Sequence, residues 1–443
     1  MIRVYLDSLG CSKNQIDAER MLFNLKEEGL SVVFDDLEAD VVIINTCAFI
    51  QSAKEEAIEE ILKYAELKNE GMIKGLIITG CLSERYRDEV VKEFPEADAI
   101  LGIGSNEEIV KAVKKAYGNE HYVSFGNKEN LKLNGGRIRL DLPHIGYLKI
   151  ADGCSNNCAY CAIPKIRGKL RSVPINEVLQ EAKKLISENV KELILIAQDS
   201  TVYGLDLPEK SSLKILLEKL CELDGDFKIR LLYCYPERID DELIDIIKNE
   251  DKILNYLDIP IQHSSNKILK SMNRHITKEQ IQNLIDKLRK QIPDIAIRTT
   301  VMVGFPGETK EDFEDLYNFI DKNKFERLGC FAYSREENTE ACYMENQIPE
   351  DIKDERRQLI ETLQYDILIK QNRNEIGKVY RAVVDGKDEA LSEYIARSYK
   401  DAPEVDTFII FNSNRELNCG DFVTLKITDC NEYDLVGELL EEK

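Results

Sequence analysis

Cys154, Cys158 and Cys161 stand at the spacing C-x-x-x-C-x-x-C, and their loop contains no fourth cysteine. A structural zinc site uses four protein ligands, which commonly come from paired CxxC or HxxxH motifs. Thiolates are also the preferred ligands of iron–sulfur clusters, and a [4Fe–4S] cubane held by three of them keeps one iron open to a small molecule. The spacing therefore favours a reactive cluster. The alternatives are a zinc site that borrows His144 and buried cysteines that bind no metal.

The first part of the chain alternates between short apolar runs and helical patterns, which is typical of parallel βαβ units. The expected strands are Val4–Leu6, Val41–Asn45, Leu76–Thr79 and Ile100–Gly102, and the expected helices are Asp17–Glu28 and Ser52–Lys68. We therefore expect an N-terminal open parallel α/β domain over residues 1–117. The polar stretch that follows, with its Asn, Lys and Gly residues, is predicted to be a linker over residues 118–139.

A second β/α series follows and carries the cysteine loop after its first strand. Its expected strands are Tyr147–Ala151, Leu193–Ala197, Lys228–Tyr233, Tyr256–Ile261, Ala296–Gly304 and Leu328–Ser334. Six such units predict a central, partial (βα)6 barrel over residues 140–374, in which reactive groups lie at the carboxyl ends of the strands. Beyond the charged helix Ile352–Asn374, a run of short strands predicts a small all-β barrel over residues 376–443. These strands are Val379–Val384, Glu393–Arg397, Thr407–Phe411, Phe422–Asp429 and Leu435–Leu440.

Length and composition narrow the class of protein. A chain of 443 residues is too long for one hydrophobic core. The sequence has no apolar run of 18 residues and begins in a strand pattern without signal-peptide features, so we expect a cytoplasmic protein that does not span a membrane. In a reducing cytosol, its twelve cysteines favour metal binding or redox chemistry over disulfides. A formal net charge of −22 disfavours general affinity for nucleic acid and favours a basic partner.

Three other cysteines, Cys11, Cys47 and Cys81, each follow an expected strand of the N-terminal domain. The carboxyl ends of parallel strands meet at one edge of a sheet, where ligands gather. These cysteines can therefore converge on one point and bind a second metal group. Unrelated buried thiols are the alternative, and position alone does not decide between the two.

The loop Cys154–Cys161, placed after the first strand of a β/α series, resembles that of the radical S-adenosylmethionine (SAM) enzymes. In that family the open iron binds SAM, and one electron cleaves SAM to methionine and a 5′-deoxyadenosyl radical that takes a hydrogen from an unactivated carbon. The resemblance implies that Tyr160 contacts the cofactor. Gln198, after the second strand, and Gly304, after the fifth, are further candidates for SAM contacts, although a plain turn also explains Gly304. No residue is assigned a catalytic role.

Over its full length the chain resembles the methylthiotransferases, which combine an N-terminal α/β domain, a radical SAM domain and a small β-barrel called a TRAM domain. This resemblance implies a second [4Fe–4S] cluster on Cys11, Cys47 and Cys81. It also implies that SAM serves both as methyl donor and as radical source. An electron donor and a sulfur donor are the other implied partners, and no membrane is involved.

The methylthiotransferases divide into enzymes that modify an adenosine of tRNA and one that modifies an aspartate of ribosomal protein S12. Four stretches resemble the ribosomal-protein branch: Ser8–Asn14, Gln198–Gly204, Tyr233–Pro236 and Arg397–Asp406. At the first cysteine the tRNA branch typically has Gly-Cys-Gln-Met-Asn, whereas this chain has Gly-Cys-Ser-Lys-Asn. The resemblance therefore implies transfer of a methylthio group to the β-carbon of that aspartate.

Charge favours the same branch. Residues 376–443 hold 8 Lys/Arg and 15 Asp/Glu, a net charge of −7, which suits a basic ribosomal protein better than the phosphates of tRNA. An ordinary solvated acidic surface is the alternative explanation. Two other functions stay open: a tRNA adenosine 2-methylthiotransferase and a two-cluster iron–sulfur electron carrier. The carrier would normally bind each cluster through four cysteines.

Overall fold

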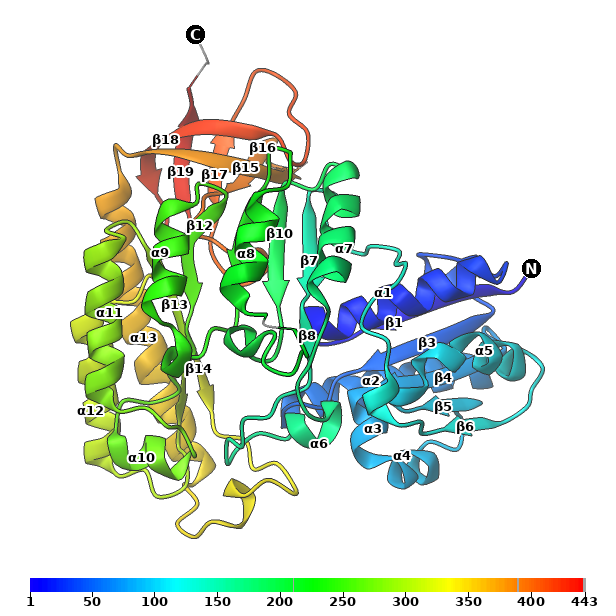
Figure 1. The fold of residues 1–443 in the computed structure, drawn as a ribbon. Coiled ribbons are helices and arrows are strands. Elements are labelled where there is room, and N and C mark those ends of the chain that lie inside the picture. Colours follow the sequence, from blue (N-terminus) through cyan, green and yellow to red (C-terminus); the bar gives the residue numbers. More distant parts are fainter. Residues whose placement is uncertain (210, 389, 441–443) are drawn as a thin grey trace.

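The computed structural model describes residues 1–209, 211–388 and 390–440, which form three units in chain order (Figure 1). An N-terminal α/β domain leads into a central β/α domain, and a small closed β-barrel follows. In Figure 1 the C-terminal barrel lies above the central domain, and the N-terminal domain lies beside the lower part of the central domain. The expected fold class is confirmed in all three parts.

The N-terminal domain is built on a parallel six-stranded sheet in the order β2-β1-β3-β4-β5-β6. The strands are β1 (Arg3–Ser8), β2 (Ser31–Val32), β3 (Val41–Thr46), β4 (Gly75–Gly80), β5 (Ala99–Leu101) and β6 (Tyr122–Ser124). The helices are α1 (Ser12–Glu27), α2 (Gln51–Asn69), α3 (Cys81–Tyr86), α4 (Asp88–Glu93) and α5 (Ile109–Tyr117). Every residue of β3 and β4 is buried, as expected of parallel strands covered by helices on both faces.

Strand β6 lies in the segment that the sequence predicts to be a linker, and it pairs with β5 at the edge of the N-terminal sheet. Its three residues are too few for a period-two pattern to stand out among polar neighbours. The N-terminal sheet therefore extends further along the chain than the hydrophobic pattern indicates.

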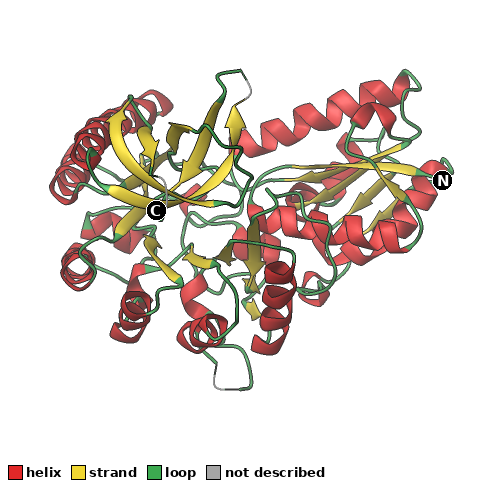
Figure 2. Ribbon diagram, turned by 90° about the horizontal axis from the view of Figure 1, so that it is seen from above, coloured by secondary structure: helices red, strands yellow, loops and turns green. Residues whose placement is uncertain are grey.

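The central domain is an open, all-parallel sheet in the order β14-β13-β12-β11-β10-β7. Its strands are β7 (Ile145–Lys149), β10 (Glu192–Ile196), β11 (Lys228–Leu231), β12 (Ile253–Asp258), β13 (Ala296–Val303) and β14 (Arg327–Ala332). The longer helices, which form an arc outside the strands in Figure 2, are α7 (Ile175–Ser187), α8 (Leu213–Cys221), α9 (Asp241–Asn249), α11 (Lys278–Gln291), α12 (Lys310–Asn323) and α13 (Glu350–Glu375). Short elements complete the domain: β8 (Ala151–Asp152), α6 (Ile163–Arg167), β9 (Arg171–Ser172) and α10 (Asn266–Ser271).

The C-terminal barrel closes in the order β15-β16-β17-β19-β18. Its strands are β15 (Val379–Asp388), β16 (Glu393–Arg397), β17 (Ile409–Asn412), β18 (Phe422–Cys430) and β19 (Leu435–Leu439). Alternate residues of these strands point inward and form one apolar core, to which Val384, Phe411 and Leu425 belong. Closure leaves no open sheet edge in this barrel, which suits a module of this size.

The loop between β16 and β17 closes the amino-terminal end of the central sheet. Ala402 packs among Tyr147, Tyr256 and other apolar side chains inside that sheet. The Tyr256 hydroxyl donates a hydrogen bond to Asp406 at 2.7 Å, and Arg298 donates to the same carboxylate at 3.3 Å. The buried part of the stretch Arg397–Asp406, which resembles the ribosomal-protein branch, therefore forms a plug against the central sheet, whereas Glu404 and Val405 are exposed.

A cavity of about 820 Å³ lies between the C-terminal barrel and the amino-terminal ends of the central strands. Its lining mixes basic side chains such as Lys228 and Arg381 with acidic ones such as Glu250 and Asp251. This cavity is at the opposite end of the strands from the cysteine loop, so it is not continuous with the mouth of the central barrel.

Glu192 joins the central sheet to the C-terminal barrel. Its carboxylate accepts hydrogen bonds from Arg230 at 2.5 Å and from Arg397 at 2.8 Å. Burial alone would raise the pKa of Glu192, but the two guanidinium groups outweigh burial and lower the pKa to about 2. The carboxylate is therefore ionised in the folded protein over the whole neutral and mildly acidic range.

We predict that Glu192→Gln lowers the free energy of unfolding by about 3 kcal/mol at pH 7 and by progressively less at lower pH. The folded-state pKa lies below the ordinary value of 4.5, so the stabilisation is complete above pH 4.5 and is lost as the pH falls to about 2. Urea unfolding of both proteins at pH 7, 4 and 3, followed by circular dichroism, measures the difference. The exposed Glu222→Gln is the control and should change stability by less than about 0.5 kcal/mol. A difference that stays constant with pH would contradict the prediction.

No helix in the described parts of the chain combines the length and apolar character that a membrane crossing requires.

Candidate functional site

The central cysteine loop runs from β8 to α6, at the carboxyl end of β7. Cys154 and Cys158 are buried, and Cys161 is partly exposed. The backbone holds the loop in shape, because Cys154 N–H donates to the Gly168 carbonyl at 3.1 Å and Cys161 N–H donates to the Cys158 carbonyl at 3.0 Å. Loss of water around the thiols raises the pKa of Cys154 to about 11 and that of Cys161 to about 12. The neighbouring thiols raise these pKa values further, so the three thiols lie near one another.

Polar side chains brace this loop against the central sheet. Asn156 donates to Asp199 at 2.8 Å, and Arg238 bonds to both Asp199 and Asn156 at 2.9 Å. On the other side, the Tyr235 hydroxyl lies 3.5 Å from Cys158 Sγ. The loop is thus tied to residues that follow β10 and β11, and these contacts hold its cysteines in place.

His144 does not belong to this loop. It precedes β7, at the opposite end of the strand from the cysteines, and its Nε2 lies 2.7 Å from Asp385 Oδ1 of the C-terminal barrel. A zinc site that combines His144 with Cys154, Cys158 and Cys161 is therefore incompatible with the fold.

The second group of cysteines gathers at the carboxyl edge of the N-terminal sheet. Cys11 precedes α1 after β1, Cys47 follows β3, and Cys81 begins α3 after β4. Gly10 has φ +87°, and a Cβ placed there would lie 2.7 Å from Cys47 Sγ. The absence of a side chain at Gly10 lets the loops that carry Cys11 and Cys47 approach each other closely.

The three thiols differ in their electrostatic surroundings. Burial raises the pKa of Cys47, and it raises the pKa of Cys81 to about 12. At Cys11, loss of water acts in the same direction, but the positive charges of Lys13 and Arg167 and nearby backbone N–H groups outweigh it and lower the pKa. Cys11 affects the pKa of both other thiols, which indicates that the three sulfur atoms lie close together.

Both sets of cysteines fit a [4Fe–4S] cluster by donor type. Each thiolate of such a cluster binds a different iron at a corner of a cube, so the sulfurs need not converge as closely as the ligands of one ion. Across residues 1–209, 211–388 and 390–440, no three Cys, His, Asp or Glu side chains form a group that could hold a single metal ion. The assignment of a [4Fe–4S] cluster to each set therefore rests on the presence of three thiols in the set and on the effect of each thiol on the pKa of its neighbours.

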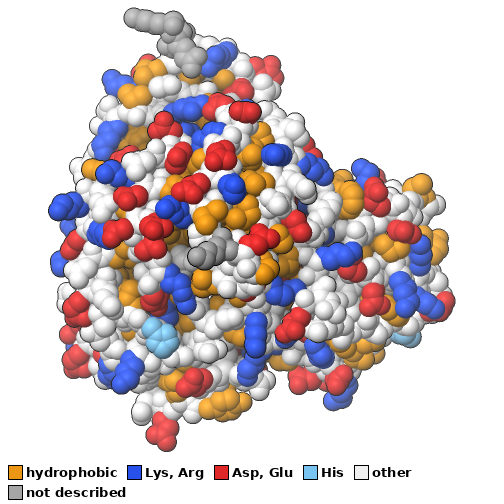
Figure 3. Space-filling view, in the orientation of Figure 1, with side chains coloured by type: hydrophobic (Ala, Val, Ile, Leu, Met, Phe, Trp, Pro, Cys, Tyr) orange, Lys and Arg blue, Asp and Glu red, His pale blue; other side chains and the backbone are white. Residues whose placement is uncertain are grey.

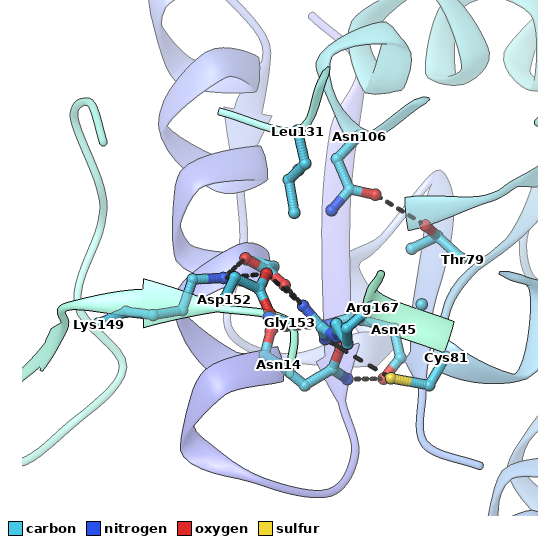
Figure 4. A network of polar contacts seen from close by, with 12 residues as sticks. Asn14, Asn45, Thr79, Cys81, Asn106, Leu131, Lys149, Asp152, Gly153 and Arg167 are labelled. Atoms are coloured by element: carbon cyan, nitrogen blue, oxygen red, sulfur yellow. Dashed lines mark hydrogen bonds and ion pairs between the residues drawn. The ribbon is translucent and has the colours of Figure 1, made fainter. Parts of the chain in front are cut away.

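A buried network of charges runs from Cys81 of the N-terminal set to Asp152, which precedes Cys154 by two residues (Figure 4). Arg167, at the end of α6, donates to Cys81 Sγ at 3.5 Å, to Asn14 at 3.0 Å, to Asp152 at 3.2 Å and to Asp17. Lys149 contacts Asp17 and lies 3.2 Å from Asp152. The side chains of the four charged residues are at most 2% exposed. The N-terminal and central domains are therefore fastened together by two carboxylates and two cations.

The structure places the three residues expected to contact SAM near the carboxyl end of the central sheet. Tyr160 is half-buried against the apolar group that includes Phe305 and Tyr333. Gln198 donates to Asp152 at 3.0 Å and so joins the charge network. A Cβ on Gly304 would lie 2.3 Å from Lys353 Cγ, so α13 occupies the space beside this glycine. Contact of Tyr160, Gln198 and Gly304 with SAM remains a prediction.

Sequence reasoning missed the residues that connect the two sets of cysteines. Asp17, Lys149, Asp152 and Arg167 come from four separate segments, and charged residues at such positions usually face solvent. One local signal was present: Lys149 and Asp152 interrupt or end an otherwise apolar strand region, where an unpaired charge would be costly.

Three family profiles match consecutive parts of the chain. Residues 3–102 match a family described as uncharacterised, UPF0004; residues 148–320 match the radical SAM superfamily; and residues 376–440 match the TRAM domain. The boundaries follow the three structural units described above.

Curated relatives match the chain from end to end. A protein of Clostridioides difficile named ribosomal protein uS12 methylthiotransferase RimO is 47% identical over 449 residues, which cover all of both chains. A protein of Lachnoclostridium phytofermentans with the same name is 46% identical and covers 98% of this chain and 99% of its own. A third, from Caldanaerobacter subterraneus, is 48% identical over 99% of this chain and all of its own.

Solved structures share the fold at low sequence identity. The radical SAM methyltransferase TsrM from Kitasatospora setae superposes with a TM-score of 0.56 at 13% identity, covering 75% of this chain and 74% of its own. The cobalamin-dependent radical SAM enzyme OxsB gives a TM-score of 0.53 at 13% identity, covering 83% of this chain and 58% of its own. At this sequence identity these similarities show a shared fold alone.

Proposed function

The chain belongs to the ribosomal protein uS12 methylthiotransferase family of radical SAM enzymes, and we propose that it adds a methylthio group to the β-carbon of an aspartate of ribosomal protein S12. It is an enzyme that transfers a methylthio group. The proposal includes two [4Fe–4S] clusters and two uses of SAM, as methyl donor and as radical source. The observation that carries it is the presence of one cysteine trio on each side of a domain interface that a buried charge network spans.

Cys154, Cys158 and Cys161 would hold the cluster that binds SAM, and Cys11, Cys47 and Cys81 would hold the other. Bound there, the clusters supply the one-electron and sulfur chemistry that side chains lack for an unactivated C–H bond.

The chain's own side chains hold the two trios in a fixed relation. Arg167 touches both the Cys81 thiol and Asp152, which stands two residues before Cys154. Gln198 fixes the other oxygen of Asp152 at 3.0 Å. Because these contacts are buried, water is excluded from the interface and the side chains move little. A reaction that needs the sulfur donor and the substrate carbon to be aligned requires such rigidity.

The names of the relatives support ribosomal protein S12 as the substrate. The acidic charge of residues 376–443 also favours a basic substrate such as a ribosomal protein. However, the C-terminal barrel lies at the opposite end of the central strands from the cysteines. We therefore assign that charge to the long-range attraction of a basic partner, not to contacts with the target residue. Acidic and basic side chains are interspersed on the face seen in Figure 3.

A reducing compartment fits the cysteines. All twelve are free thiols, including surface-exposed Cys419. We propose the cytoplasm as the location, together with an electron donor and a sulfur donor supplied there from outside this chain.

The substrate is tested with the anaerobically reconstituted protein, SAM, reductant and sulfide, together with either ribosomal protein S12 or unmodified tRNA. Mass spectrometry is expected to find a methylthio adduct on one aspartate of S12 and none on tRNA. A reaction without SAM is the control. An adduct on tRNA alone would instead establish the tRNA adenosine 2-methylthiotransferase, and intact SAM with both substrates would favour an electron carrier.

A further inference from the structure

Lys13 is a buried cation that forms no ion pair with a carboxylate, although its charge lowers the pKa of the neighbouring Cys11 thiol. Ten lysine and arginine residues are buried in the described part of the chain, and nine of them have a carboxylate oxygen within 4.0 Å. These nine are Arg20, Lys54, Arg137, Lys149, Arg167, Arg230, Arg274, Lys353 and Arg397. Lys13 is 7% exposed, and no carboxylate oxygen of a described residue lies within that distance of its Nζ.

The side chain of Lys13 crosses the interface between the N-terminal and central domains. Lys13 lies in the first turn of α1, two residues after Cys11. Its Nζ is 3.5 Å from the carbonyl of Ala197, which follows β10, and 3.3 Å from the ring centroid of Tyr233, which follows β11. The ammonium group therefore stands at the carboxyl ends of two central strands, beside one of the cysteine trios.

The nearby carboxylate of Asp258 is hydrogen-bonded through Oδ2, whereas its Oδ1 has no hydrogen-bond partner among the described residues. Asp258, at the end of β12, is close enough for Lys13 to affect its pKa. However, Asp258 accepts the Tyr233 N–H at 3.0 Å and lies 3.6 Å from Arg298. Lys13 is left with one long hydrogen bond and the face of an aromatic ring, which offset only part of the cost of burying its charge.

A buried charge that the fold leaves unpaired, next to the reacting groups, indicates an anionic ligand. The proposed substrate side chain is such an anion, and its carboxylate carbon is bonded directly to the β-carbon that reacts. A cation that fixes the carboxylate also fixes the β-carbon one bond away.

We propose that Lys13 binds the carboxylate of the substrate aspartate and thereby selects aspartate over neutral side chains. This inference rests on the proposed function. At the equivalent position the tRNA-branch motif quoted above, Gly-Cys-Gln-Met-Asn, has a methionine, which has no charge to offer. SAM also has a carboxylate, but both branches use SAM, so a residue that differs between them fits the substrate better.

The test compares S12 with an S12 variant in which the modified aspartate, located by mass spectrometry, is replaced by asparagine. Affinities for the reconstituted protein with SAM are measured by fluorescence anisotropy without reductant, so that no turnover occurs. The wild-type protein should bind the aspartate form at least about 30-fold more tightly. Lys13→Met should reduce this preference to within about 3-fold, and Lys13→Arg should keep part of it. Lys169→Met, which removes an exposed lysine from the loop after α6, should keep all of it.

Several outcomes would overturn the assignment. If Lys13→Met keeps the preference for aspartate while it loses iron or binds SAM more weakly, the partner of Lys13 is the cluster or the SAM carboxylate. If wild-type protein modifies S12 but binds the aspartate and asparagine forms alike, or if Lys13→Met keeps the preference with normal iron content and SAM affinity, Lys13 does not select the substrate. Failure of wild-type protein to modify S12 at all would refute the proposed function itself.

Folding of the variant is checked independently. The thermal midpoint of cluster-free Lys13→Met should equal or exceed that of the wild type, because an apolar side chain of similar length replaces an unpaired buried charge. A lower midpoint would contradict the view that Lys13 is unpaired in the unliganded protein. In that event the binding comparison is made with Lys13→Arg alone, and loss of the aspartate preference in a folded Lys13→Arg would refute the assignment.

Discussion

Replacing Cys158 with alanine is expected to abolish both SAM cleavage and methylthio transfer, whereas replacing Cys47 is expected to abolish transfer alone. Each trio supplies three thiolates, and two thiolates do not retain a cluster that needs three. We expect formation of 5′-deoxyadenosine to fall by roughly 10³-fold or more in Cys158→Ala, because side chains offer no other route to the radical. In Cys47→Ala it should continue, since Cys154, Cys158 and Cys161 are intact.

Iron content and chromatography of the SAM products measure these effects separately. Each variant should lose about half of the iron of the reconstituted wild type, as expected of two equal clusters. Cys330→Ala is the matched control, because Cys330 is a half-buried thiol on β14 that belongs to neither trio. Full iron content in Cys47→Ala, or loss of SAM cleavage in both variants alike, would contradict separate roles for the two trios.

The placement of the two sets of cysteines follows from the sequence because both depend on local rules. Cys154, Cys158 and Cys161 are close in sequence, and their loop directly follows a strand. Cys47 and Cys81 lie at the ends of β3 and β4, which neighbour each other in the sheet, so parallel pairing alone brings them together. The near-continuous apolar runs of these two strands predict that both of their faces are buried.

Features that depend on contacts between domains were not predictable in the same way. The plug around Ala402 and Asp406 is a polar loop in the sequence, and only its partners Tyr256 and Arg298 place it inside the central sheet. The stretch Arg397–Asp406 resembles the ribosomal-protein branch, and its contacts with the central sheet show a structural role. A sequence motif that resembles a family does not by itself show whether its residues pack inside the protein or contact the substrate.

The buried charge network is the second such feature, and it leads to the prediction with the largest effect on stability. Arg167→Met is expected to lower the free energy of unfolding by about 3–5 kcal/mol. Without Arg167, the carboxylates of Asp17 and Asp152 share Lys149 alone, which leaves one uncompensated negative charge in a region at most 2% exposed. The contacts of Arg167 with Asn14 and Cys81 are lost as well.

Urea unfolding of the cluster-free protein, followed by far-UV circular dichroism, measures this cost without a contribution from iron; the chain contains no tryptophan for fluorescence. Arg171→Met is the matched control, because Arg171 lies near Arg167 but donates to the carbonyls of Glu129 and Leu131. It should cost no more than about 1.5 kcal/mol per hydrogen bond lost.

A second substitution separates charge from packing. In Arg167→Met combined with Asp17→Asn, one carboxylate faces one ammonium again, so at least half of the lost stability should return. If the network mainly fastens the two domains, limited proteolysis between residues 118 and 139 should also speed up in Arg167→Met and slow again in the double variant. Opening the interface would free Leu131 and Arg137, the buried residues of that segment. A loss of less than about 1 kcal/mol, or no recovery in the double variant, would show that packing of α6 holds the cysteine trios together. Recovery would show instead that the charge balance around Arg167 fastens the two domains, and among the described residues Arg167 is the one cation of the network that contacts a cysteine of the N-terminal trio.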